Sequence, residues 1–193
     1  PSITDAGAPV FGQMKELKSL TLIHASKLTG KAAAALADHP TLENAAGDED
    51  FFANGTAHLA TCKKLKALRL YHGFVTDATV LPLAGNTTIE TIILWPLLRV
   101  GVSDAAMPAL ASMTGLKDIT IGHSVLSFEG LKKLKALPNL TRITLTEVAL
   151  PDGDLEKLNA EMPKVRIAHT PMTPETRAEW EKFAAKQKAT APK

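Results

Sequence analysis

The sequence has few of the residues on which several classes of protein depend. One cysteine among 193 residues leaves no internal disulfide and no zinc site built from several cysteines. Only 5% of the residues are aromatic, and the 22 basic and 20 acidic residues are well mixed, without the basic stripe that a nucleic-acid-binding protein needs. We therefore expect no nucleic-acid partner.

Long apolar runs are missing as well. The longest, residues 92–98, falls well short of the ~18 residues of a membrane span and is interrupted by Pro96. With 45% hydrophobic and 22% charged residues, the composition is that of a soluble folded protein without a membrane span. The compartment stays open between the cytoplasm and export after removal of a signal peptide, and the oligomeric state stays open too.

Familiar catalytic motifs do not occur. The sequence contains no Gly-rich phosphate loop, no His-Glu-x-x-His, no Gly-x-Ser-x-Gly and no paired-cysteine motif. The single thiol, Cys62, ends the apolar stretch 59–62, where a buried packing role is expected. We therefore expect neither enzymatic activity nor a cofactor.

What the sequence does contain is a repeated pattern, Leu-x-x-Leu-x-Leu. Its copies follow one another at steps of 25, 23, 24, 27, 24 and 22 residues. Five copies are clear and two are weak, and they start at Leu17, Leu42 (weak), Leu65, Ile89, Leu116, Leu140 and Met162 (weak). A fixed period of this length predicts a stack of similar units rather than one closed core.

Each unit is predicted to be a strand, a turn, a helix and a second turn. Leu68 and Leu70 flank Arg69, the alternation of a strand with one buried face. About five residues later an apolar residue precedes Ser or Thr, as in 75–77, and these hydroxyls suit a helix N-cap. An Ala- and Leu-rich segment such as 130–137 follows, with leucines at helical spacing.

These units resemble the leucine-rich-repeat family, over about residues 3–172, and within it the bacterial cysteine-containing or related helical subtype. The resemblance implies an α/β, right-handed curved solenoid of about six full repeats plus terminal half-repeats. It also implies a parallel sheet on the concave face, helices on the convex face, and recognition of proteins. The chain departs from the family where Asn, Cys or Thr is usual, which suggests looser loops; those positions hold Ala25, Asp50, Gly73, Leu97, Ser124, Val148 and Thr170.

The two ends of the chain differ from the repeats. Residues 1–172 form the predicted solenoid, which begins in mid-repeat, because 3–7 matches a helix start with no strand pattern before it. A half-repeat that caps the stack and a strand-bearing part located before residue 1 are both compatible with this start.

A last helix is predicted over 173–188, with Pro174 at its first position, and 189–193 is expected to be a flexible tail. Trp180 and Phe183 lie three residues apart and are expected to seal the open edge of the last repeat. The alternative is a partner-binding helix.

The candidate binding residues lie on the outward face of the predicted strands. Tyr71 and Trp95 take the same place in adjacent repeats, and Arg69 precedes Tyr71 by two residues on the same face. Trp, Tyr and Arg dominate binding hot spots, so we predict a partner-binding site from these three with Ile93 and Arg142. The alternative is that both rings pack against the next loop.

The fourth repeat is the longest, and its extra length falls in residues 95–101. A loop that breaks the pattern and carries large apolar side chains is a frequent place for function. A buried bulge that fills a local gap is the alternative.

A column of histidine and glutamate is predicted along one edge of the stack, two residues after the last apolar residue of each strand. Its members, apart from Pro96 in the fourth repeat, are His24, Glu49, His72, His123, Glu147 and His169. Duplication of a pair of repeats would leave this alternation without function. A pH-sensitive or metal-binding edge is the alternative, although histidines two strands apart start ~10 Å from each other, so we expect no metal site.

The leading hypothesis is a non-catalytic module that binds a protein or peptide on its concave face. A second is the recognition domain of a larger enzyme or signalling protein whose catalytic part lies outside this chain. A third is an enzyme that uses the His/Glu column as acid and base, which is disfavoured because the column runs along an edge and does not converge on a cleft.

Overall fold

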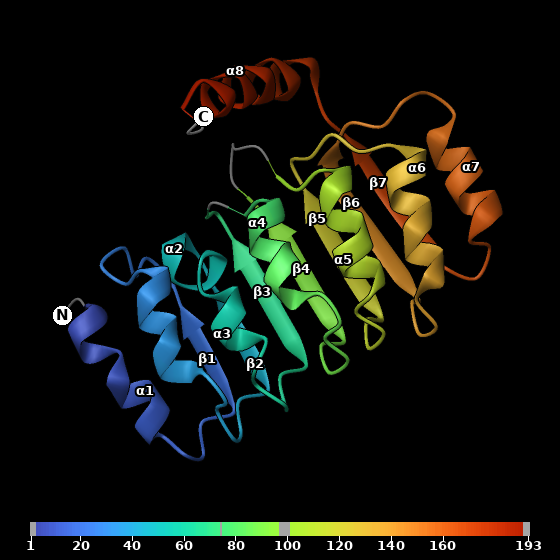
Figure 1. The fold of residues 1–193 in the computed structure, drawn as a ribbon. Helices are drawn as coiled ribbons and strands as arrows, with labels where there is room; N and C mark the ends of the chain where they lie inside the picture. The colour runs from blue at the N-terminus through green and yellow to red at the C-terminus, as the bar shows by residue number, and fades with distance from the viewer. Residues whose placement is uncertain (1–2, 74, 97–100, 191–193) are drawn as a thin grey trace.

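The computed structural model of the chain describes residues 3–73, 75–96 and 101–190 and has an α/β fold (Figure 1). Seven parallel strands form one sheet in the order of the sequence. The strands are β1 (Ser19–Leu22), β2 (Asn44–Gly47), β3 (Ala67–Tyr71), β4 (Thr91–Trp95), β5 (Asp118–Gly122), β6 (Arg142–Val148) and β7 (Arg166–Pro171).

Short helices connect the strands and cover one face of the sheet (Figure 1). The α-helices are α1 (Pro9–Gln13), α2 (Glu49–Ala53), α3 (Thr56–Leu59), α4 (Asp77–Val80), α5 (Met107–Ala111), α6 (Phe128–Leu131), α7 (Asp154–Glu161) and α8 (Pro174–Thr190). The 3-10 helices are η1 (Asp5–Gly7), η2 (Gly30–Leu36), η3 (Leu81–Leu83), η4 (Asp104–Ala106) and η5 (Lys132–Ala136). Within the part of the chain that the structure describes, no helix is long and apolar enough to cross a membrane.

The predicted repeat pattern is confirmed for six of the seven strands. Strand pairing aligns the fourth position of the pattern from β1 to β6, and these side chains point into the core; they are Leu20, Ala45, Leu68, Ile92, Ile119 and Ile143. Apart from the buried Ala67, the alternate side chains of β3, β4 and β5 are half-buried on the other face. One face of the sheet is therefore packed under helices, while the opposite face is accessible.

The predicted register of the seventh strand is wrong by two residues. Ile143 pairs with Ile167 and Leu145 pairs with His169, so Val165 is not a strand position of the core. The N–H of Val165 donates to the carbonyl of Met162, the same turn that Leu116 makes with Met113. Met162 and Val165 thus belong to a turn that precedes the strand. Ile167 of β7 follows its partner Ile143 of β6 by 24 residues.

The weak second repeat has a packing explanation. Where other strands place large aliphatic residues, β2 has Ala45 and Gly47, and the space is filled by Phe51 and Phe52, which are both buried. The Phe52 ring lies so close to Gly47 that a Cβ there would be 2.7 Å from two of its carbons. The Phe51 and Phe52 rings meet edge to face at 4.8 Å, so aromatic packing from α2 replaces the missing leucines.

Helix starts join neighbouring repeats. Serine caps its own helix as predicted, since Ser103 Oγ accepts from the N–H of Ala105. The nearby aspartates do not cap their own helices: Asp77 accepts from the N–H and hydroxyl of Ser103 in the next repeat, at 2.7 and 2.6 Å. Asp104 makes the same two contacts with Ser127. These carboxylates hold successive units in register on the helix side.

The last helix, α8, begins at Pro174 as predicted, with Thr173 Oγ1 accepting from the N–H of Thr176. It extends through Thr190, past the predicted end at residue 188, and the rest of the expected tail, 191–193, lies outside the described residues. Figure 1 shows α8 turning back beyond the C-terminal ends of the strands. Trp180 is half-buried and Phe183 is 38% exposed, so the predicted sealing of the last repeat stays a prediction.

Candidate functional site

The accessible face of the sheet carries the largest side chains on β3 and β4. The register places Arg69 opposite Ile93 and Tyr71 opposite Trp95, which confirms the predicted adjacency of the two aromatic residues. All four side chains are half-buried. We call these four residues the β3–β4 patch. The ring of Tyr71 has an edge contact with the imidazole of His72, at 6.4 Å between centroids.

Trp95 rests on the backbone of the next strand. A Cβ built at Gly122 of β5 would lie 3.0 Å from Cδ1 and 3.2 Å from Cγ of the indole. The glycine therefore allows the ring to lie against β5, where any side chain would push it outward. This packing fixes the position of the indole while leaving Trp95 partly exposed, and the sequence pattern did not reveal it.

The two predicted arginines differ in their partners. Arg142 Nε lies 2.9 Å from Asp118 Oδ1 on the neighbouring strand, so Arg142 has an ion-pair partner within the chain. The side chain of Arg69 has no hydrogen bond or ion pair with any residue of the described ranges. Of the two predicted arginines, Arg142 is thus already paired with an acid, whereas the side chain of Arg69 has no partner among the described residues.

The residues predicted as a functional loop lie only partly within the described chain. Trp95 and Pro96 are described, and the N–H of Gly101 donates to the carbonyl of His123. Leu97, Leu98, Arg99 and Val100 lie outside the described residues.

The histidine column marks a special backbone conformation. His24, His72, His123 and Glu147 have positive φ angles of 54°, 56°, 46° and 52°. Histidine is several-fold enriched in this left-handed region, so the turns after β1, β3 and β5 account for the three histidines without any ligand, while Glu147 lies at a bulge inside β6. Loop geometry, more than chemistry, explains the column.

Two members of the predicted column do not take part in it. Glu49 opens α2, and His169 pairs with Leu145 inside β7, because the register of the last strand differs from the predicted one. His169 Nε2 instead lies 2.7 Å from the carbonyl oxygen of Val148. Glu49 and His169 therefore do not share the positive φ of the other four members of the column.

Carboxylates do flank the histidines, but not all at the predicted positions. His123 Nδ1 lies 3.0 Å from Glu147 Oε2, a contact whose geometry is not that of a hydrogen bond. The partner of His24 is Asp48, which sequence reasoning missed: its carboxylate is 97% buried, accepts from the His24 N–H at 2.7 Å and lies 3.2 Å from Nδ1. Asp48 follows His24 by 24 residues, one repeat, and this spacing was the sequence signal that could have revealed the pair.

Metal binding has no support from these contacts. Among the described residues, no group of three or more His, Cys, Asp or Glu side chains is placed to hold a metal ion. Within the described residues the edge holds two separate acid–imidazole pairs, His24 with Asp48 and His123 with Glu147.

We predict that His123 makes the stability of the fold sensitive to acid. Burial lowers the pKa of His123, the Glu147 carboxylate raises it less, and His72 lowers it further. The neutral ring is thus favoured in the fold, so its contribution is fully present above the ordinary pKa of about 6.5 and is lost as the pH falls below it. We expect His123→Asn, which keeps a residue suited to positive φ, to flatten the fall in urea midpoint between pH 7.5 and 5.5.

The matched control is His72→Asn at the same turn position, where the ring is exposed. This variant removes only the smallest of the three influences on the pKa of His123 and should therefore retain most of the slope of the parent. An unchanged slope in His123→Asn would show that other groups govern the acid response.

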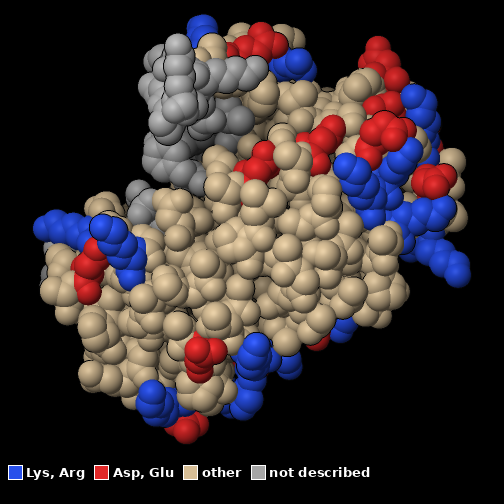
Figure 2. Space-filling view, viewed as in Figure 1, with Lys and Arg blue, Asp and Glu red and all other residues tan. Residues whose placement is uncertain are grey.

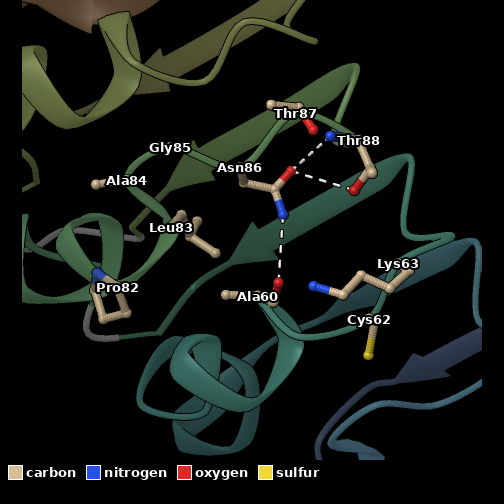
Figure 3. A pocket seen from close by; sticks show the side chains of 10 residues that line it. All are labelled: Ala60, Cys62, Lys63, Pro82, Leu83, Ala84, Gly85, Asn86, Thr87 and Thr88. Carbon is tan, nitrogen blue, oxygen red and sulfur yellow. Dashed lines mark hydrogen bonds between the residues drawn. The ribbon is translucent and has the colours of Figure 1, made fainter.

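A separate hollow of about 210 Å³ lies beside Cys62, between the loops that precede β3 and β4 (Figure 3). One of its polar side chains, Asn86, holds its own loop: Oδ1 accepts from the N–H groups of Thr88 and Ile89. Cys62 is fully buried, as predicted, and donates to the Leu36 carbonyl at 3.0 Å. Burial raises the pKa of the thiol, so the hollow offers no activated nucleophile.

The helix face of the molecule has a mixed charge distribution. Figure 2 shows acidic and basic side chains side by side toward the last repeats. Two of the lysines there are paired, Lys135 with Glu161 at 2.7 Å and Lys157 with Asp154 at 3.0 Å. The strongest concentration of binding-type side chains is thus the β3–β4 patch on the opposite face.

Comparison of the chain with known protein families gave no match, and comparison with curated proteins gave none either. The function is therefore argued from the residues and the geometry above.

Proposed function

We propose that the chain is a leucine-rich-repeat solenoid that binds a protein or peptide, without catalysis, on the sheet face opposite its helices. The observation that carries this proposal is the pairing of Tyr71 with Trp95 on adjacent strands, half-buried and flanked by Arg69. Tyr and Trp on a rigid strand surface give a large contact area with a small loss of conformational freedom, and Arg is the third residue type that dominates binding hot spots.

The composition of the rest of that face supports a focused contact. In the column that contains Arg69 and Ile93, the other positions are small: Thr21, Ala46, Thr120, Thr144 and Ala168. Small residues around a few large anchors are typical of an interface in which a central cluster supplies most of the affinity.

The acid–imidazole pairs support binding over acid–base catalysis. His24 with Asp48 and His123 with Glu147 lie at positions where a strand ends in a turn, and the backbone conformation accounts for both histidines. They sit in separate repeats and do not converge on one reacting atom. The same binding face would serve a recognition domain of a larger protein equally well.

The proposal is tested by affinity capture from lysate and secreted fractions of the source organism. The baits are the parent and a triple variant, Arg69→Ala, Tyr71→Ala and Trp95→Ala. We expect a partner of the parent to be depleted at least tenfold on the variant, since each hot-spot truncation costs about 2 kcal/mol or more.

A second triple variant provides the control, with Thr120→Ala, Thr144→Ala and Thr146→Ala on the same face. It should retain the partner, and circular dichroism should show both variants folded. Equal capture by the parent and the β3–β4 variant would remove the proposed site.

A further inference from the structure

The charges on the sheet face opposite the helices do not balance. The charged side chains at the outward positions of its strands, within the described ranges, are Arg69, Asp118, Arg142 and Arg166. Asp48 is buried against His24, and Asp118 is paired with Arg142. Arg69 and Arg166 are the two that have no ion pair among the described residues, and both are positive. The face as a whole is short of negative charge.

The excess positive charge at the β3–β4 patch comes from Arg69, which has no acidic residue beside it on the neighbouring strands. Its register neighbours are Ala46 on β2 and Ile93 on β4, neither of which can accept a hydrogen bond through its side chain. Arg69 as a whole residue is half-buried, so its side chain is partly removed from water. A planar guanidinium in this setting favours a carboxylate, which it can bind through two parallel hydrogen bonds.

The apolar part of the patch lies within reach of the same ligand. Tyr71 follows Arg69 by two residues, ~7 Å along the strand, and Trp95 lies one strand spacing, ~4.8 Å, to the side. Gly122 holds the indole of Trp95 against β5, so the apolar surface is formed before a ligand arrives. Neighbouring side chains of one peptide can span these distances.

Resting on the proposed function, we propose that the partner is a peptide segment in which Asp or Glu stands next to an aromatic or large aliphatic residue. The carboxylate binds Arg69, and the apolar side chain packs on Tyr71 and Trp95. Of the described acids at this edge, Asp48 is buried against His24 and Glu147 faces His123, so neither competes for Arg69.

The test begins with phage-displayed random 12-residue peptides selected on the full chain. We expect enrichment of Asp or Glu within two positions of Trp, Phe or Leu. An enriched peptide is then synthesised with its acid and with the matched amide, and binding is followed by fluorescence anisotropy. The amide form should bind the parent at least tenfold more weakly, whereas Arg69→Gln should bind the two forms within twofold of each other.

The outcomes separate this inference from the function on which it rests. Enriched peptides that are lost with Tyr71→Ala and Trp95→Ala but show no preference for an acid would overturn the inference and leave the binding site standing. Peptides that bind equally to the parent and to these variants, or no enrichment at all, would overturn both.

A second copy of the chain is the competing occupant, because α8 presents the exposed Glu179 directly before Trp180. Sedimentation equilibrium of the parent and of Arg69→Gln distinguishes this case. A dimer that disappears in the variant would assign the patch to self-association and overturn the proposed partner, while a monomer in both supports it.

Discussion

Replacing Gly47 by alanine is expected to lower the free energy of unfolding by about 2–4 kcal/mol, although alanine is closer to the repeat pattern than glycine. The added Cβ would lie 2.5 Å from the carbonyl oxygen of Leu22 and 2.7 Å from two carbons of the Phe52 ring. One neighbour is strand backbone and the other a fully buried ring, so neither can move without disturbing the core. Urea unfolding followed by circular dichroism measures the loss.

Two further variants make the experiment specific. Ala46→Thr on the same strand points to the accessible face, where β1 carries Thr21, and should stay within about 0.5 kcal/mol of the parent. Phe52→Leu in the Gly47→Ala background relieves the ring contact. The loss of stability in this double variant should therefore be smaller than the sum of the losses in the two single variants. A stability of Gly47→Ala equal to that of the parent would contradict the close packing of β2 against α2.

Truncating Phe51 to alanine is expected to cost about 3–5 kcal/mol. The ring is completely buried and meets Phe52 at 4.8 Å and Phe11 at 6.2 Å, both edge to face. Phe11 belongs to α1, so Phe51 is the contact that ties the first helix to the second repeat. The total loss is measured by chemical denaturation.

Hydrogen exchange shows where this loss is located. Because each repeat packs on its neighbours, amides of β1 and β2 should exchange faster in Phe51→Ala, while those of β5 and β6 should change much less. Phe51→Leu retains most of the buried surface and should cost less than half as much. Uniform acceleration along the whole sheet would mean that the chain unfolds as one cooperative unit.

The spacing of apolar residues was enough to predict six strands, because burial of one face of each strand determines their register. It was insufficient at both unusual repeats, for different physical reasons. In the second repeat, the core volume comes from Phe51 and Phe52, which lie after the strand and outside the pattern. In the last, Met162 and Val165 imitate the pattern at the right spacing but form a turn.

The candidate site was predictable in part. Tyr71 and Trp95 were found from their equal repeat positions, which parallel pairing in register turns into neighbours. The packing of Trp95 against Gly122 was not predicted, because a glycine in the sequence does not indicate which side chain lies against it. The pairing of Arg142 with Asp118 was within reach, since residues one repeat apart at the same position lie on adjacent strands.

The sequential strand order has a consequence for how the chain folds. Parallel pairing usually demands long-range closure, but here every strand meets a partner that is only one repeat away. The entropy of closing each crossover is therefore nearly the same along the chain and grows no larger as strands are added. Assembly can start at any adjacent pair and spread in both directions, so the most stable pair of repeats, rather than the topology, decides where the first native contacts form.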